Sequence, residues 1–431
     1  MSNPLQGPEF HLNPYPAYAQ LRSSAPVQKV PTGHGRYSYL ITGYAEARAA
    51  FTDSRLSKNT ARFFADKPSE RNLHPAVSQT MLATDPPHHA RLRRLVTQAF
   101  TRGTVDRLRP YIQQVSTGLV DTFLPDGRAD LVEDLAVPLP VTVICHMLGV
   151  PEADRPAVRQ WSNDLFAAGQ PARIDAASHA LAEFMTDLVE TKRRSPDGSL
   201  LTDLIAARDG RDALDESELV SLAVLLLVAG HETTTNFIGN AALALLQHPE
   251  SLAQLREDPE LLGTALDELL RFDSPVGIAT FRYTTEPLTL GGTDIPSGVP
   301  VLIAPGAANR DPAHFPDPEE LDLDRTAKDH LAFGHGIHRC LGAPLARAEA
   351  EIALDTLLTR CGRLRLAVPA EDLQWRRTRL MRGLESLPVV FQPVQPGGRP
   401  CPYTPGAGLN SSRTPPRAEL LQPRHNHSDV S

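Results

Sequence analysis

The stretch FGHGIHRCLG, residues 333–342, places Cys340 among three glycines and directly before the helix-like run APLARAEAEIALDTLL (343–358). The glycines permit positive φ angles or a close approach of another group to the backbone. His338 and Arg339 can favour a thiolate or bind an anion. The pattern G-x-G-x-x-G is not met, because Arg339 stands where its third glycine would be. Cys340 could be a nucleophile or a small buried thiol. A third role, a thiolate metal ligand at the start of a helix, accounts for all the features of this stretch.

The composition is that of an ordinary globular chain of 431 residues, 41% hydrophobic and 22% charged, with a formal net charge of −8. Such a chain is not expected to bind nucleic acid, which needs a basic surface. Its cysteines, Cys145, Cys340, Cys361 and Cys401, form no C-x-x-C pair, which disfavours a zinc ribbon, a redox pair and covalently attached haem. No signal peptide is visible, and the longest apolar run, 222–230, is about half of the roughly 20 residues that a membrane span needs. We expect a soluble, cytoplasmic protein without membrane association.

The hydrophobic pattern predicts several helices. One long apolar helix is expected over 216–247, interrupted at Gly230. Two further helices, hinged at an Asp-Pro step, are expected over 249–272. Residues 89–100 should form a helix whose N-terminus is capped by Asp85. The fold is therefore expected to be mainly α-helical.

A smaller β region is expected after these helices. Residues 281–318 are rich in Thr and Val and broken by Gly and Pro, which predicts short strands and turns. Residues 382–393 end the core in strand-like fashion. The tail 395–431 is rich in Pro, Gly, Ser and Asn and is expected to be disordered. Residues 1–394 are expected to form a single domain.

The stretch AGHETTT, residues 229–235, carries an acid and an alcohol in the middle of the long apolar helix. It is not the zinc-protease pattern H-E-x-x-H, because the second histidine is absent. Buried polar groups need a partner or a purpose. One interpretation is a helix kink with threonines bonded to the previous turn. The other is a proton-relay pair, Glu232 and Thr233, exposed at a cavity by Ala229 and Gly230.

Two pairs of charged residues have ambiguous spacing. Glu268 and Arg271 stand three apart on a helix, a spacing most often found in solvated ion pairs. His89 and Arg93 stand one turn apart and form either a solvated basic face or an anion site. Arg282 is equally ambiguous by itself.

Taken together, these stretches resemble the soluble bacterial cytochromes P450. FGHGIHRCLG fits the family's haem-binding loop Phe-x-x-Gly-x-x-x-Cys-x-Gly, ELLR fits its Glu-x-x-Arg pair, and AGHETT fits its oxygen-activation stretch. DPPHHARLRRLV, NRDPAHFPDP and RGLESLPVVF follow the family's order and spacing. The resemblance covers residues 10–393 and implies the cytochrome P450 fold, with haem between the long central helix and the cysteine loop.

The resemblance implies a role for each ambiguous residue. Cys340 would be the axial thiolate ligand of a b-type haem. Glu232 and Thr233 would pass protons during oxygen activation, and Glu268 with Arg271 would be structural. The residues expected to contact the haem or its propionates are His89, Arg93, Ala229, Gly230, Arg282, Phe333, His338 and Gly342.

The implied activity is a monooxygenase that uses O₂ and electrons from NAD(P)H to hydroxylate, or epoxidise, a large hydrophobic small molecule. A separate ferredoxin and its reductase are the expected partners, and a monomer is expected. A basic face for the ferredoxin would comprise Arg94, Arg102, Arg107, Arg109 and Arg339. A peroxide-driven peroxygenase is disfavoured by the intact acid–alcohol pair, and a non-catalytic haem sensor is the alternative from another class.

The substrate pocket is expected, by position in the family, to be mostly apolar, which suits a large hydrophobic ligand. Its expected lining is Phe63, Phe64, Leu82, Trp161, Leu165, Phe166, Leu225, Ile278, Thr280, Leu380 and Met381. The LLLVAGHETTTNFIGN helix most resembles members that tailor macrolides and other polyketides. Hydroxylation of a terpenoid, steroid or fatty acid is the alternative.

Overall fold

The computed structural model describes residues 5, 7–33, 35–66, 71–97, 100–167, 169–206, 208–209 and 212–394. The tail 395–431, expected to be disordered, lies outside the described residues. The longer helices are α2 (Tyr15–Ser24), α3 (Tyr44–Thr52), α6 (His88–Thr97), α7 (Arg102–Phe123), α8 (Pro138–Leu148), α9 (Arg155–Asp164), α10 (Pro171–Arg194), α12 (Glu216–Gln247), α13 (Pro249–Glu257), α14 (Leu262–Phe272) and α16 (Ala343–Arg360). The shorter ones are α1 (Pro8–Leu12), α4 (Thr60–Phe64), α5 (Pro75–Ser78), α11 (Leu200–Ala206) and α15 (Pro305–Ala308).

The strands of the described residues form four small sheets. The largest has the order β1-β2-β10-β7-β3, in which β2 and β10 run parallel and the other neighbours antiparallel. Its strands are β1 (Val27–Gly33), β2 (Arg36–Ile41), β3 (Leu56–Ser57), β7 (Arg282–Thr284) and β10 (Pro300–Ile303). The others are β4 (Arg128–Asp130) with β11 (Cys361–Leu366) and β12 (Pro388–Pro393), β5 (Arg208–Asp209) with β6 (Asp212–Ala213), and β8 (Leu288–Leu290) with β9 (Thr293–Ile295). The expected mainly helical fold with a smaller β region is confirmed.

The central helix α12 begins at a capping box, in which Asp215 accepts the backbone N–H of Glu218 and the Glu218 side chain accepts that of Asp215. The predicted range is confirmed, but the predicted interruption at Gly230 is wrong, since the helix is continuous. A Cβ on Gly230 would lie 3.1 Å from Ile144 Cδ1. The glycine therefore lets α8 approach α12 closely, and this packing explains its presence without a break.

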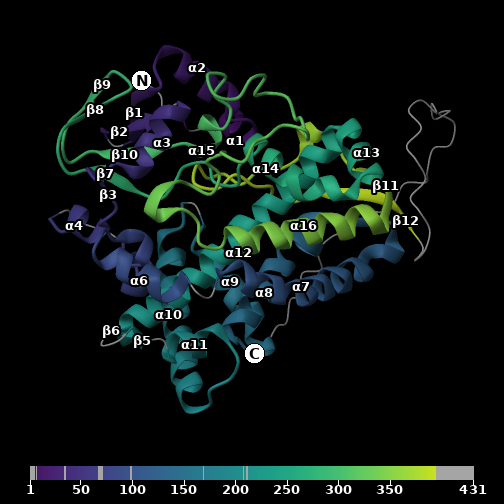
Figure 1. The fold of residues 1–431 in the computed structure, drawn as a ribbon, viewed down its shortest axis with the longest axis horizontal. Coiled ribbons are helices and arrows are strands. Elements are labelled where there is room, and N and C mark those ends of the chain that lie inside the picture. Colours follow the sequence, from purple (N-terminus) through teal and green to yellow (C-terminus); the bar gives the residue numbers. More distant parts are fainter. Residues whose placement is uncertain are drawn as a thin grey trace, which may run out of the picture. The chain divides into compact units, whose positions relative to one another are not determined.

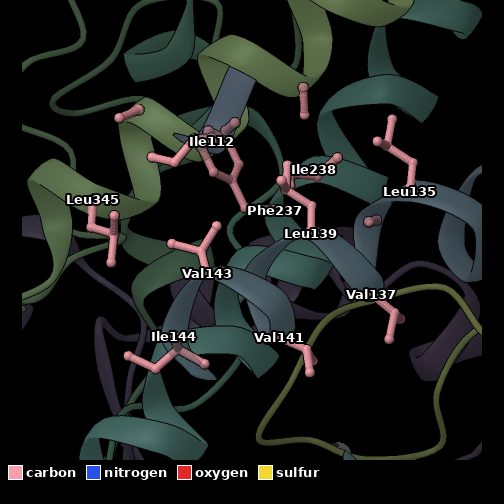
Figure 2. Packing of buried hydrophobic residues seen from close by; sticks show 14 of the residues in the cluster. Ile112, Leu135, Val137, Leu139, Val141, Val143, Ile144, Phe237, Ile238 and Leu345 are labelled. Carbon is pink, nitrogen blue, oxygen red and sulfur yellow. The ribbon is translucent and has the colours of Figure 1, made fainter. Parts of the chain in front are cut away.

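The main core lies where α7, α8, α12 and α16 meet (Figure 1). Figure 2 shows Ile112 of α7, Leu139 and Val143 of α8, and Phe237 of α12 gathered in this core. These side chains are almost completely buried, which removes from water the apolar faces that the sequence pattern predicted. In Figure 1 the strands β1, β2, β8 and β9 lie with α2 and α3 on the other side of the fold.

The start of α6 differs from the prediction. The helix begins at His88, and the Asp85 carboxylate accepts hydrogen bonds from the Lys58 backbone N–H, at 2.9 Å, and from the Ser57 hydroxyl. The predicted cap by this side chain is therefore wrong. Asp85 instead fixes the segment after β3 against the start of α6, and this junction positions the site described below.

One described helix, α12, is long and apolar enough to cross a membrane by length and composition. Two thirds of its most apolar window is buried inside the protein, as expected for a core helix.

Candidate active site

The cysteine loop is shaped by two glycines in the left-handed region, Gly334 at φ 69° and Gly336 at φ 74°. A Cβ on Gly336 would lie 3.0 Å from the Phe51 carbonyl oxygen, so the loop packs closely on α3. The Cys340 N–H donates to the Phe333 carbonyl oxygen at 2.8 Å, which closes the loop. These contacts hold the cysteine immediately before α16.

The Cys340 sulfur faces hydrogen-bond donors at the start of α16. Burial raises the pKa of the Cys340 thiol, and the N–H groups of Gly342 and Ala343 oppose this by stabilising the thiolate. Arg93 and Arg339 lower the pKa of the thiol further through their charges. Cys340 is nevertheless exposed in this structure, so a ligand can reach its sulfur. An accessible thiolate with amide donors suits a metal ligand.

Four cationic or imidazole side chains gather beside this loop. His89 of α6 and His338 of the loop have ring centroids 4.0 Å apart, and Arg282 of β7 and Lys58 act on His338 through their charges. His89 and Arg282 are buried, and Lys58 is 1% exposed. Three of the predicted residues, His89, Arg282 and His338, are thus brought together, although their segments are far apart in sequence.

The buried cluster holds positive charge without matching negative charge. Burial, Arg93 and Lys58 lower the pKa of His89 to about 4, and burial lowers the pKa of Arg282 to about 10. His89 Nδ1, His89 Nε2 and His338 Nδ1 are buried and have no hydrogen-bond partner among the described residues. The described carboxylate that acts on the cluster is Asp85, whose oxygens already serve the residues after β3. This arrangement fits a ligand with more than one anionic group.

Lys58 is the member of the cluster that the sequence analysis missed. Its ammonium donates to the Thr280 hydroxyl, and Arg282 donates to the Thr280 carbonyl oxygen at 2.9 Å. Burial, together with the charge of Arg282, lowers the pKa of Lys58 well below its usual range. Lysine is almost always exposed, so nothing in RLSKN itself signals a buried cation. The signal would have been its position directly after a short strand that pairs with the Arg282 strand.

Arg93 lies between the cluster and the cysteine. Its guanidinium donates to the Arg339 carbonyl oxygen at 2.7 Å, one residue before Cys340, and its charge acts on the Cys340 thiol. His89 and Arg93 therefore do not form the solvated basic face that the spacing also allowed, because His89 is buried.

The middle of α12 has an accessible stripe. Ala229 is exposed and Leu225 and Thr233, one turn to either side, are half-buried, whereas most of the helix is buried. The Thr233 hydroxyl donates to the Ala229 carbonyl oxygen at 3.1 Å. Leu225, Ala229 and Thr233 thus line an open part of an otherwise packed helix.

Glu232 points elsewhere. Its carboxylate is buried and accepts from Arg376 at 2.6 Å, and its other oxygen lies 3.6 Å from His231 Nε2. The structure therefore does not bring the carboxylate of Glu232 to the hydroxyl of Thr233. The Arg376 partner lies 144 residues away in sequence, so spacing within α12 could not reveal it.

Glu268 and Arg271 are fully buried and form a two-point ion pair, with N–O distances of 2.6 and 2.8 Å. Arg271 also donates to three backbone carbonyl oxygens, at 2.8–3.1 Å. Glu268 accepts from the Asp322 N–H at 3.0 Å and from Arg325 at 3.2 Å. The solvated pair suggested by the spacing is therefore wrong, because the pair fastens α14 to residues 309–325.

The residues expected to line a substrate pocket fall into several groups. Phe63 and Phe64 pack on the Phe281 ring, with ring centroids 4.9 and 5.7 Å away, and Leu82 is half-buried in the 3₁₀ turn Met81–Ala83. Trp161 packs on Phe184 at 5.8 Å.

The remaining pocket residues lie near the 375–384 segment or in the core. Leu165, Phe166 and Leu380 line one cavity of about 340 Å³. Met381 lines a smaller one of about 20 Å³. Ile278 is buried and donates its N–H to the Leu380 carbonyl oxygen.

The donor set limits the kinds of metal group that the site could hold. Among the described residues, no group of three His, Cys, Asp or Glu side chains could bind an ion directly. A metal on Cys340 would need its other ligands from a prosthetic group, and the neighbouring cations suit the carboxylates of a porphyrin. The fold and site therefore define a haem-thiolate protein.

Comparison with known proteins gives the family. The family model described as "Cytochrome P450" matches residues 147–372. The chain is 44% identical over 396 residues to "Cytochrome P450 monooxygenase PikC" of Streptomyces venezuelae, covering 91% of this chain and 94% of that protein. It is 42% identical over 380 residues to "Mycinamicin IV hydroxylase/epoxidase" of Micromonospora griseorubida, covering 87% and 94%. The structure matches "Bacillus subtilis 168 Bacillaene Polyketide Synthase (PKS) Cytochrome P450 PksS" with a TM-score of 0.85 at 38% identity, covering 91% and 100%.

The chain belongs to the cytochrome P450 family and has its fold. It is a monooxygenase that uses haem iron, O₂ and electrons derived from NAD(P)H. Bacterial members take these electrons from redox partners such as a ferredoxin and its reductase, and they act on a small-molecule substrate. The expected family, fold and cofactors are thereby confirmed.

Proposed function

We propose that this chain inserts one oxygen atom from O₂ into a C–H bond, or an alkene, of a macrolide or other polyketide in secondary metabolism. The observation that carries the proposal is the accessible Cys340, faced by the amides of Gly342 and Ala343, beside a buried group of cations. The substrate class is supported by the likeness to a P450 named for a polyketide synthase and to a relative named as a hydroxylase/epoxidase.

Cys340 is proposed as the thiolate ligand of the haem iron. His89, Arg93, Arg282 and His338, joined by Lys58, would bind the two propionates with charge-assisted hydrogen bonds. Haem supplies the activation of O₂ when it is bound. Phe333 accepts the Cys340 N–H and the Gly342 N–H faces the sulfur. Ala229 leaves the accessible stripe of α12 free of a large side chain, whereas Gly230 faces Ile144 of α8.

Thr233 is proposed to hold a water molecule at the accessible stripe of α12 and to pass its proton onward. The support is its half-exposed hydroxyl, which already donates to a carbonyl oxygen and keeps its lone pairs free to accept. The Glu232 carboxylate accepts from Arg376 in this structure, so we propose that it separates from Arg376, takes up a proton from solvent and passes that proton to the water on Thr233. Replacing Arg376 should then change the rate at which protons reach the water held by Thr233, and the protein should keep its haem.

Other roles complete the proposal. Glu268 and Arg271 are structural, supported by their complete burial and backbone contacts. Residues 1–394 form one domain, the protein is a cytoplasmic monomer, and a ferredoxin is the electron donor. The proposed docking face is basic and includes Arg94, Arg102, Arg107, Arg109 and Arg339.

The test compares Cys340→Ser with the control Cys361→Ser. The reduced carbon monoxide complex of the parent and the control should show the strongly red-shifted Soret band, and Cys340→Ser should lack it. With ferredoxin, reductase, NADPH and ¹⁸O₂, a panel of macrolactones and polyketide carboxylic acids should include a substrate whose product carries one heavy oxygen. A haem-loaded parent without the shifted band would overturn the ligand assignment. A normal band without NADPH consumption on any substrate would indicate a haem sensor.

A further inference from the structure

A cavity of about 340 Å³ opens between the α9–α10 region and residues 377–380. Its apolar wall is formed by Leu5, Leu165, Phe166, Ile174 and Leu380. Leu380 is 46% exposed, so this part of the wall is open to solvent. The polar lining consists of His11, Arg377, Thr378 and Arg379. The cavity thus has an apolar body and a basic rim.

The basic rim comes from an arginine-rich segment whose other arginines are paired. Arg376 binds the carboxylate of Glu232 at 2.6 Å, and Arg382 binds that of Asp273 at 3.3 Å. The side chains of Arg377 and Arg379 have no ion pair or hydrogen bond in the described part of the chain. The two arginines without a carboxylate are therefore the two that line the cavity.

The charge of the cavity is positive at neutral pH. None of the described residues that line it is Asp or Glu. Burial lowers the pKa of His11, and the charges of Arg377 and Arg382 lower it further, so this histidine is neutral. The net charge of the rim is then that of Arg377 and Arg379, in a protein whose overall charge is −8.

We propose that the cavity binds a small molecule with an apolar body and an oxyanionic group, the body against Leu165, Phe166 and Leu380 and the oxyanion on Arg377 and Arg379. The planar guanidinium offers paired N–H donors that match a carboxylate or a phosphate monoester. The inference rests on the proposed function, because Phe166 and Leu380 belong to the proposed substrate pocket, and it narrows the substrate to an acidic amphiphile. A cationic substrate is disfavoured by the same rim.

The test uses the full-length, haem-loaded protein and four probes with one chain length: dodecanoate, dodecyl phosphate, 1-dodecanol and dodecyltrimethylammonium. Dissociation constants are measured by calorimetry, with the Soret shift as a second readout. At least one oxyanionic probe should bind about tenfold more tightly than the alcohol, equivalent to about 1.4 kcal/mol, and the cation should bind most weakly. Whichever oxyanion binds more tightly identifies the group as carboxylate or phosphate. Raising the salt concentration should weaken only the oxyanions.

The variants are Arg377→Gln and Arg379→Gln, with Arg365→Gln on β11 as the matched control, since Arg365 is exposed and lies outside the cavity lining. Each rim variant should weaken binding of the preferred oxyanion by three- to tenfold and leave binding of the alcohol unchanged. The control should change neither. Equal binding of alcohol and oxyanions, or rim variants that behave like the control, would overturn the inference. A parent without the red-shifted carbon monoxide band would overturn the proposed function instead, so the two failures are distinguishable.

Discussion

Replacing Arg271 by methionine tests whether this side chain fastens α14 to residues 309–325. The guanidinium is completely buried, forms a two-point ion pair with Glu268 and donates to the carbonyl oxygens of Asn309, Pro318 and Glu320. Methionine fills part of the volume but leaves the buried carboxylate with fewer partners and three carbonyl groups without their donor.

The expected cost can be estimated from this geometry. Breaking a buried pair by removing one partner costs about 3–5 kcal/mol. Glu268 keeps its bonds from the Asp322 N–H and Arg325, which argues for the lower part of this range. The three lost carbonyl contacts argue for the upper part, because each is a hydrogen bond from a charged group. We expect Arg271→Met to lower the free energy of unfolding by about 4 kcal/mol.

The control is Arg360→Met, which removes a surface ion pair with Asp121 at 2.7 Å. Exposed pairs contribute about 0–1 kcal/mol, so this variant should stay within 1 kcal/mol of the parent. Urea unfolding of the haem-loaded proteins, followed by circular dichroism, gives both values from the midpoint and slope. If Arg271→Met costs no more than Arg360→Met, the ion pair is not what fastens α14 to residues 309–325.

Two further predictions concern the site. Lys58→Met should increase the rate of haem loss to excess apomyoglobin about tenfold, and it should raise the stability of the haem-free protein because a buried amine is removed. The control Lys29→Met should change neither quantity. A rate of haem loss equal to that of the parent would refute the proposed contact between Lys58 and the haem. Thr233→Ala should keep the haem spectrum, while the amount of product formed per NADPH falls about tenfold and the amount of hydrogen peroxide rises. The control Thr234→Ala removes a similar hydrogen bond from a buried threonine and should leave the product formed per NADPH unchanged.

The helices could be predicted well because their signals are local. The range of α12 follows from its long apolar stretch, and the break between α13 and α14 follows from Pro259. The predictions were wrong where a residue with a local structural preference interacts with a segment that is distant in sequence. Asp85 is a good helix cap, but the segment after β3 uses its carboxylate. Gly230 would weaken an isolated helix, but α8 packs against it.

The site could be predicted only in part, for the same reason. Motif spacing indicates which residue types occur together, and it singled out Cys340 and four basic residues near it. Spacing does not indicate burial, so Glu268 and Arg271 resembled a surface pair. It also does not indicate partners from remote segments, so neither the Glu232–Arg376 pair nor Lys58 was visible.

The charges at the proposed haem site explain why so many cations are buried in an acidic protein. The cluster holds the basic side chains of Lys58, Arg93 and Arg282 with the carboxylate of Asp85, and two propionates and one thiolate would supply further negative charge. His89 and His338, whose pKa values are lowered by burial, are neutral and would serve as hydrogen-bond donors. Buried cations without anions destabilise a fold, whereas matched ones are tolerated. Haem binding should therefore contribute to stability by neutralising a cluster that the apoprotein keeps at an energetic cost.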